Sequence, residues 1–131
     1  MPNTRSKRVP PYARLAMTET PRFIQGVYTF RGAGLGQPRH LQPPASYKVP
    51  FDKRAQLIYL RAGNSTDQMI YLALLRGKKA FRYFPIAAKG AVHVQLAIVE
   101  DLDPESELEL TLGAPEGLEG SVLVDLGILE I

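Results

Sequence analysis

The sequence predicts an all-β protein, and three observations support this fold class. Apolar and polar residues alternate in the last third of the chain, as in Ala91–Val99 and Glu107–Leu112. Glycine and proline, 11 of each in 131 residues, divide the chain into short apolar runs. No long segment has apolar residues at helical spacing. We therefore expect an antiparallel two-sheet β-sandwich of about eight strands, jelly-roll-like in strand number.

The first half of the domain alternates between strand-like runs and turns. Phe23–Arg31 is aromatic and β-branched, and it leads into a glycine cluster. A proline-rich loop is expected over Gln37–Ala45. Tyr47–Phe51 alternates with polar positions, and Pro50 places it at a sheet edge or at a strand end. Gln56–Ala62 is almost continuously apolar and precedes a turn rich in Gly, Asn, Ser and Thr.

The second half contains a hairpin and the most regular strands. Gln68–Leu75 and Ala80–Phe84 are joined by a short connector with one glycine, which predicts a β-hairpin. In Ala91–Val99 and Glu107–Leu112 one face is apolar, so that face should lie in the core. Ser121–Ile131 is apolar on both faces apart from two acids, which is typical of a strand covered on both sides. The expected core residues of the two regular strands are Val92, Val94, Leu96, Leu108, Leu110 and Leu112.

The chain divides into a basic, proline-rich N-terminal arm over residues 1–21 and a single sandwich domain over residues 22–131. The basic residues of the arm are Arg5, Lys7, Arg8 and Arg14. The arm lacks the apolar run of a secretory signal, and no segment is apolar enough over the length of a membrane span. We therefore expect no membrane partner, and a location in the cytoplasm or in a particle assembled inside the cell.

Charge is distributed unevenly along the chain, although the net charge is only +3. Residues 1–66 contain 11 Lys and Arg and 2 acids, whereas residues 67–131 contain 5 Lys and Arg and 11 acids. The strands could fold the two halves together and give a mixed surface, or opposite patches could pair between copies of the chain. The arm could also bind phosphates of a nucleic acid. This last interpretation is the least favoured, because Tyr12 is the only aromatic residue of the arm.

Several classes of chemistry are excluded or disfavoured. The absence of cysteine excludes disulfides, thiolate metal sites and cysteine nucleophiles. The cluster Gly32–Gly36 lacks the third glycine of a dinucleotide-binding loop, because Gln37 stands at that position. No serine lies in a nucleophile-elbow motif. The acids around Asp101–Glu105 lack the spacing of an EF-hand, so a solvated acidic turn is preferred over a calcium site. We expect no cofactor, no metal site and no catalytic activity.

Two residues are candidates for ligand binding. Asp125 lies in an apolar segment, where a carboxylate is costly unless it is paired. It is therefore held by a partner such as Arg61, Arg82 or a backbone turn, or it faces a ligand on an open sheet face. His40, in the proline-rich loop, is the second candidate. His93 lies on the polar face of its strand and is expected to be solvated.

The aromatic residues include several tyrosines, which tolerate half-exposure and are favoured at interfaces. Arg82 and Tyr83, together with the basic residues of the arm, are the expected partner-binding residues. We predict a non-enzymatic module that self-associates, or docks onto a larger protein assembly, through the arm and the tyrosine-rich strands. A carbohydrate-binding sandwich is the alternative, although the absence of tryptophan weakens it. An enzyme based on carboxylates ranks third.

Overall fold

The computed structural model of the chain describes residues 19–96 and 101–131. The strands of this part are, in chain order, β1 (Thr20–Arg31), β2 (Gly34–His40), β3 (Ser46–Lys48), β4 (Ala55–Asn64), β5 (Ile70–Arg76), β6 (Lys79–Ile86), β7 (Ala91–Gln95), β8 (Asp101–Leu102), β9 (Glu107–Ala114) and β10 (Glu119–Glu130). The described residues contain no helix with the length and apolar character needed to cross a membrane. The expected arm residues Arg5, Lys7, Arg8 and Arg14 lie outside the described residues, as does the end of Ala91–Val99.

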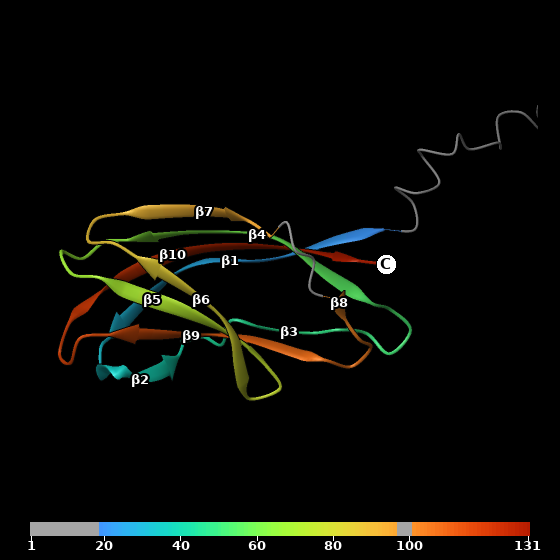
Figure 1. Ribbon diagram of the computed structural model, residues 1–131, viewed down its shortest axis with the longest axis horizontal. Helices are drawn as coiled ribbons and strands as arrows, with labels where there is room; N and C mark the ends of the chain where they lie inside the picture. Colours follow the sequence, from blue (N-terminus) through green and yellow to red (C-terminus); the bar gives the residue numbers. More distant parts are fainter. Residues whose placement is uncertain (1–18, 97–100) are drawn as a thin grey trace, which may run out of the picture.

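The strands form two five-stranded antiparallel sheets that pack as an upper and a lower layer in Figure 1. Sheet A has the order β1-β10-β4-β7, and β8 also pairs with β4. Sheet B has the order β2-β9-β5-β6, and β3 also pairs with β9. The chain crosses between the layers, since β1 and β4 belong to sheet A and β2 and β3 to sheet B. The all-β, two-sheet prediction is confirmed.

Each predicted strand segment contains a strand of the structure, whereas β2 and β8 were not predicted. β2 replaces part of the expected loop Gln37–Ala45. It is exposed along nearly its whole length, and its pairing with β9 is interrupted between Gly34 and Arg39. A strand of this kind shows no apolar alternation, so it could not be predicted from periodicity. The predicted strand Tyr47–Phe51 ends earlier, at Lys48.

Two further expectations are corrected. β1 begins at Thr20, because Thr20 and Pro21 pair with Glu130 and Leu129 of β10, so the sandwich domain starts before residue 22. The expectation that Ser121–Ile131 is covered on both sides is wrong. β10 lies between β1 and β4, but no described layer covers the outer face of sheet A, and Leu123 is 50% exposed there.

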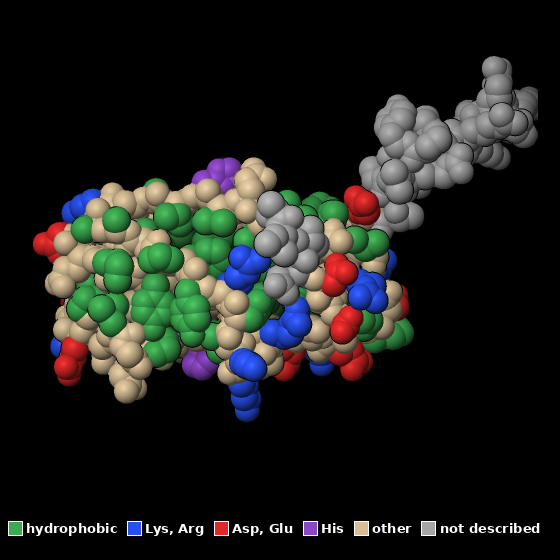
Figure 2. All heavy atoms as spheres, in the orientation of Figure 1, with side chains coloured by type: hydrophobic (Ala, Val, Ile, Leu, Met, Phe, Trp, Pro, Cys, Tyr) green, Lys and Arg blue, Asp and Glu red, His purple; other side chains and the backbone are tan. Residues whose placement is uncertain are grey.

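The fold brings the basic first half and the acidic second half of the sequence together in ion pairs. Each described ion pair joins a basic residue from the first half of the chain to an acid from the second half. The pairs are Arg22–Glu130, Arg31–Glu119, Arg54–Asp103 and Arg61–Asp125, and His40 also contacts Glu109. On the face shown in Figure 2, basic and acidic side chains are interspersed. The mixed-surface interpretation therefore describes this face, and the charge pattern gives no support for pairing between separate patches of two copies.

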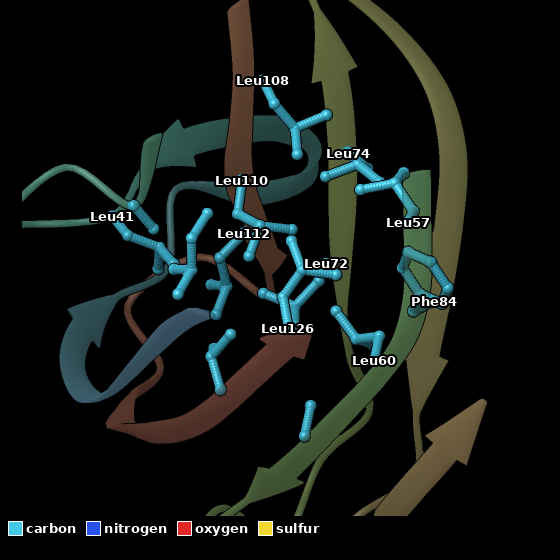
Figure 3. Packing of buried hydrophobic residues seen from close by; sticks show 14 of the residues in the cluster. Leu41, Leu57, Leu60, Leu72, Leu74, Phe84, Leu108, Leu110, Leu112 and Leu126 are labelled. Atoms are coloured by element: carbon cyan, nitrogen blue, oxygen red, sulfur yellow. The ribbon is translucent and has the colours of Figure 1, made fainter. Parts of the chain in front are cut away.

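The core lies between the two sheets and is built mainly from leucines (Figure 3). Leu57 and Leu60 come from sheet A, and Leu72 and Leu110 come from sheet B. The predicted core faces are confirmed. The residues Leu96, Leu108, Leu110 and Leu112 are buried, and Val92 and Val94 are partly buried against the same cluster.

A second contact between the sheets is polar. Glu130, at the end of β10, is buried, and its carboxylate accepts a hydrogen bond of 2.5 Å from the Tyr47 hydroxyl on β3. Arg22 Nε lies 3.2 Å from the same carboxylate. Burial, together with the hydrogen bond to Glu130, raises the pKa of Tyr47 above its ordinary value, so the phenol remains protonated.

Truncation of Leu110 to alanine should lower the free energy of unfolding by about 2–5 kcal/mol, because the side chain is fully buried and its loss leaves a cavity. Urea denaturation measures this change. Leu35→Ala, on exposed β2, is the matched control and should change stability by less than about 0.5 kcal/mol. A similarly small loss for Leu110→Ala would show that the core face of β9 is misassigned.

Candidate functional site

The outer face of sheet A carries a row of polar side chains that crosses four strands. The strand register places Gln25 of β1, Asp125 of β10, Arg61 of β4 and His93 of β7 opposite one another. Side chains alternate along each strand, and Val124, next to Asp125, points into the core. The four polar residues therefore lie on the face that points away from sheet B. We call them the polar row.

Asp125 occupies the middle of the polar row and is only 8% exposed. Its Oδ1 accepts hydrogen bonds from Gln25 Nε2 at 3.0 Å and from Tyr59 Oη at 2.9 Å. Its Oδ2 accepts from Arg61 Nε at 3.1 Å and from Arg61 Nη2 at 2.5 Å. Each oxygen thus has two donors, which is the usual capacity of a carboxylate. Of the partners considered from sequence, Arg61 is the one that binds Asp125, whereas Arg82 belongs to β6 of sheet B.

The charges of this network are fixed by the contacts. Burial acts to raise the pKa of Asp125, but the hydrogen bonds from Gln25, Arg61 and Tyr59 outweigh it, and the pKa lies below its ordinary value. The hydrogen bond to Asp125 raises the pKa of Arg61. Burial and the hydrogen bond to Asp125 raise the pKa of Tyr59. At neutral pH the carboxylate is ionised and its donors keep their protons, so none of these groups is adjusted for proton transfer near neutrality.

Aromatic contacts hold the same side chains in place. The Tyr59 ring lies over Gly127, since a Cβ at Gly127 would stand 2.2 Å from the ring atom Cε2. Any larger residue at this position would displace the ring. The Arg61 guanidinium carbon lies 5.3 Å from the centroid of the Tyr59 ring, and the His93 ring meets Tyr59 edge-on at 6.1 Å. The network is therefore complete within the chain and requires no ligand to order it.

Apolar side chains flank the polar row on both sides. Val27 and Leu123 stand opposite each other on β1 and β10, and they are 66% and 50% exposed. Phe23, on the other side of the row, is 53% exposed. Next to Leu123, the small residues Gly63 and Ala91 line a shallow hollow of about 520 Å³. We call the polar row together with Phe23, Val27 and Leu123 the sheet A face.

The three apolar residues of the sheet A face were not among the binding residues predicted from the sequence. Their signal was present, because Phe23, Val27 and Leu123 stand at strand positions that alternate with core residues. An apolar residue on the second face of a strand is also expected when another layer covers that face. The sequence alone does not distinguish an exposed apolar face from one that another layer covers. The interpretation of Ser121–Ile131 as a strand covered on both sides was wrong.

The second ligand candidate, His40, lies far from Asp125 in the fold. His40 pairs with Thr111 on the outer face of sheet B, and its Nδ1 lies 2.5 Å from Glu109 Oε2. The two histidines of the chain appear in purple on opposite sides of Figure 2. His40 and Asp125 therefore do not form one site.

The predicted partner-binding residues of the hairpin have different environments. Tyr83 of β6 is 63% exposed, and its ring centroid lies 5.9 Å from that of Tyr71, with the two rings inclined at 56°. Tyr71 Oη donates a hydrogen bond of 2.6 Å to the Leu35 carbonyl. Arg82 is half-buried on the same strand. The tyrosines of the described residues are thus divided between both outer faces and the core, where Tyr28 is buried, and they do not form one surface.

The acidic turn does not form a metal centre within the described residues. No group of three or more His, Asp or Glu in this part of the chain is arranged to hold an ion. Asp101 accepts a hydrogen bond from Gln56, and Asp103 accepts one from Arg54. Glu100 lies outside the described residues.

Replacement of Asp125 by asparagine should lower the free energy of unfolding by about 1–3 kcal/mol at pH 7, because charged hydrogen bonds are lost in a covered site. A lowered pKa means that the carboxylate stabilises the fold above the ordinary Asp pKa near 4, and that this contribution is lost as the pH falls through the folded-state pKa. Urea denaturation at pH 7 and pH 3 should therefore show a smaller difference between the two proteins at pH 3.

The matched control for this measurement is Asp103→Asn, because Asp103 is an exposed acid paired with Arg54. This variant should change stability by less than about 1 kcal/mol at either pH. An equal loss for Asp125→Asn at both pH values would contradict the proposed role of the ionised carboxylate.

Comparisons with known proteins indicate the fold and no family. No protein-family model matches the sequence, and no curated protein matches it. Among solved structures, the chain resembles the CBM36-1 domain of a multidomain xylanase from the hindgut metagenome of Trinervitermes trinervoides, with a TM-score of 0.55 and 18% identity over 84% of this chain and 96% of that domain. A protein of the infectious bursal disease virus Gx strain aligns with a TM-score of 0.46 and 12% identity, over 85% of this chain and 31% of the viral one. The first of these similarities supports the β-sandwich fold.

Proposed function

We propose that this chain is a non-enzymatic assembly module whose copies associate by burying the sheet A face. The observation that carries the proposal is the exposure of Phe23, Val27 and Leu123 on two neighbouring strands of one face. Several exposed apolar residues on one face, with polar groups among them, are typical of protein interaction surfaces. Full burial of each such side chain contributes about 1.5–3 kcal/mol.

The polar row favours a protein partner over a small ligand. Both oxygens of Asp125 already have their donors, so a ligand hydroxyl would have to displace Gln25, Tyr59 or Arg61. A carboxylate that is paired before association costs less to cover than one that loses water without a replacement. A second copy of the chain can therefore cover the row without breaking it.

The charges of the chain have a secondary part in this association. The described ion pairs are formed within the fold, and exposed pairs contribute only about 0–1 kcal/mol each. Apolar burial must then supply most of the association free energy. The charges of Asp125 and Arg61 also fit a binding role, because the lowered pKa of Asp125 and the raised pKa of Arg61 keep both groups ionised at neutral pH.

Carbohydrate binding on the outer face of sheet B is a second candidate. Tyr83 is well exposed there and stands next to Tyr71, and sugars pack against aromatic faces. The 56° inclination prevents the two rings from forming one flat platform, which places this candidate second. The chain has no tryptophan, so a titration with oligosaccharides can be followed by the fluorescence of its six tyrosines, Tyr71 and Tyr83 among them.

Self-association should be visible by light scattering as a mass above the 14.5 kDa of one chain that rises with protein concentration. Leu123→Lys should weaken it by about 10-fold to 100-fold in dissociation constant, because a charge replaces a buried apolar group. Leu35→Lys, the same substitution on the exposed strand of sheet B, is the control and should leave the mass unchanged. A monomer at the highest attainable concentration would rule out the proposed function.

A further inference from the structure

Sheet A ends at an unusually long and regular edge strand. β1 has 12 residues and pairs with β10 over its whole length without a register shift. The other strands at sheet edges are shorter or irregular: β7 has 5 residues, the pairing of β2 is interrupted, and that of β6 contains a register shift. A long straight edge exposes a row of backbone donors and acceptors to which another strand can bind.

The backbone groups at this edge can be assigned from the register. The Gly32 amide donates a hydrogen bond of 2.7 Å to the Leu118 carbonyl, and the same register continues along β1. Successive residues of an antiparallel strand direct their backbone groups to opposite sides. Even-numbered residues of β1 therefore bond to β10, and odd-numbered residues direct theirs outward. Pro21 is an odd-numbered residue, so its missing amide hydrogen does not interrupt the bonding to β10, and at the free edge it offers only its carbonyl to an added strand.

We propose that a second copy of this chain adds to this edge, with β1 antiparallel to β1 about a two-fold axis at Gln25. The inference rests on the proposed assembly function and specifies its partner and its geometry. A two-fold axis requires each contact to occur twice with the two copies exchanged. An axis at Gln25 places Gln25 opposite itself and Phe23 opposite Val27 of the other copy. All three residues direct their backbone groups toward the added strand.

This register is favoured by the side chains on the outer face. Phe23 and Val27 are exposed in the single chain, and an aromatic residue opposite a β-branched one is a stabilising cross-strand pair. An axis at Ile24 would place Phe23 opposite Gln25 of the other copy, and an axis at Gly26 would place Phe23 opposite Thr29 of the other copy. Only the axis at Gln25 gives both exposed apolar residues an apolar partner.

Charge at the two ends agrees with the same register. Counting outward from Gln25, Glu19 faces Arg31 of the other copy at each end of the paired strands. Glu19 is the residue before β1, and Arg31 is its last residue. Both have odd numbers, so the alternation of side chains along the strand places them on the same face. Arg31 already contacts Glu119 through Nη1, and its side chain is 70% exposed, so other nitrogens of the guanidinium can reach a second carboxylate.

Pairing at this edge would also extend the sheet A face. The two copies of sheet A would form one continuous sheet, and Phe23 and Val27 of each copy would meet across the axis. The apolar part of the sheet A face would then be shared between copies. The edge contact and the burial of Leu123 are separate contacts, since Leu123 lies on β10, one strand away from the edge.

Single cysteine variants of the full chain test the geometry, because the natural sequence has no cysteine. Directly opposed residues of an antiparallel hydrogen-bonded pair have Cα atoms about 5.5 Å apart, which is within the range of a disulfide. Gln25→Cys, incubated with oxidised glutathione, should therefore give a covalent dimer of twice 14.5 kDa on a non-reducing gel. Circular dichroism checks that the variant, which loses the hydrogen bond to Asp125, is folded.

Thr29→Cys is the matched control. It is also an exposed, odd-numbered residue of β1, but in the proposed register it faces Pro21 of the other copy. The two Thr29 residues would then be about 26 Å apart, beyond the reach of a disulfide. A mixture of Phe23→Cys and Val27→Cys should cross-link, whereas each of these variants alone should not.

The result expected is a covalent dimer for Gln25→Cys and for the mixture, with none for Thr29→Cys. Absence of the Gln25→Cys dimer, or equal cross-linking at Gln25 and Thr29, would overturn the β1 pairing. If Leu123→Lys weakens self-association while Gln25→Cys fails to cross-link, the proposed function stands and the edge pairing is wrong. If Gln25→Cys cross-links while Leu123→Lys has no effect, the edge pairing stands and the burial of the sheet A face is wrong.

Discussion

A carboxylate in the middle of a sheet is stable only where neighbouring strands supply donors, and Asp125 receives them from both sides. Gln25 reaches it from β1, and Tyr59 and Arg61 reach it from β4. The three side chains that bind Asp125 on the outer face of sheet A therefore all belong to the sheet itself. Because the charge is covered in this way, the face needs no third layer, and apolar residues beside it can remain exposed for another protein.

The other ion pairs follow from how the strands are interleaved. β10, from the end of the chain, lies between β1 and β4 from the first half, so bases and acids that are distant in sequence become neighbours. Arg31 meets Glu119, and Arg22 meets Glu130 in this way. The exposed pairs add little free energy, whereas the buried leucines between the sheets supply most of it. The uneven charge of the sequence thus reflects strand order rather than separate basic and acidic patches that pair between copies.

The fold class and the core were predictable because they depend on alternation within single strands. The buried face of β9 can be assigned from Leu108, Leu110 and Leu112 alone. β2 was not predictable, since it is exposed and its pairing is interrupted. The partner of Asp125 could be narrowed to a few basic residues, but the choice of Arg61 depends on the register between β10 and β4, which no local pattern encodes. The exposure of Leu123 likewise depends on the absence of a covering layer among the residues that the structure describes.

In the proposed dimer, β1 serves folding and association at once. Its residues of one parity, such as Ile24 and Tyr28, point into the core and direct their backbone groups to β10. Residues of the other parity, such as Phe23 and Val27, have outward side chains and outward backbone groups. A shift of one residue would bury the second set and expose the first, so the core fixes which residues the edge presents. The stability of the sandwich and the register of the proposed dimer therefore depend on the same alternation.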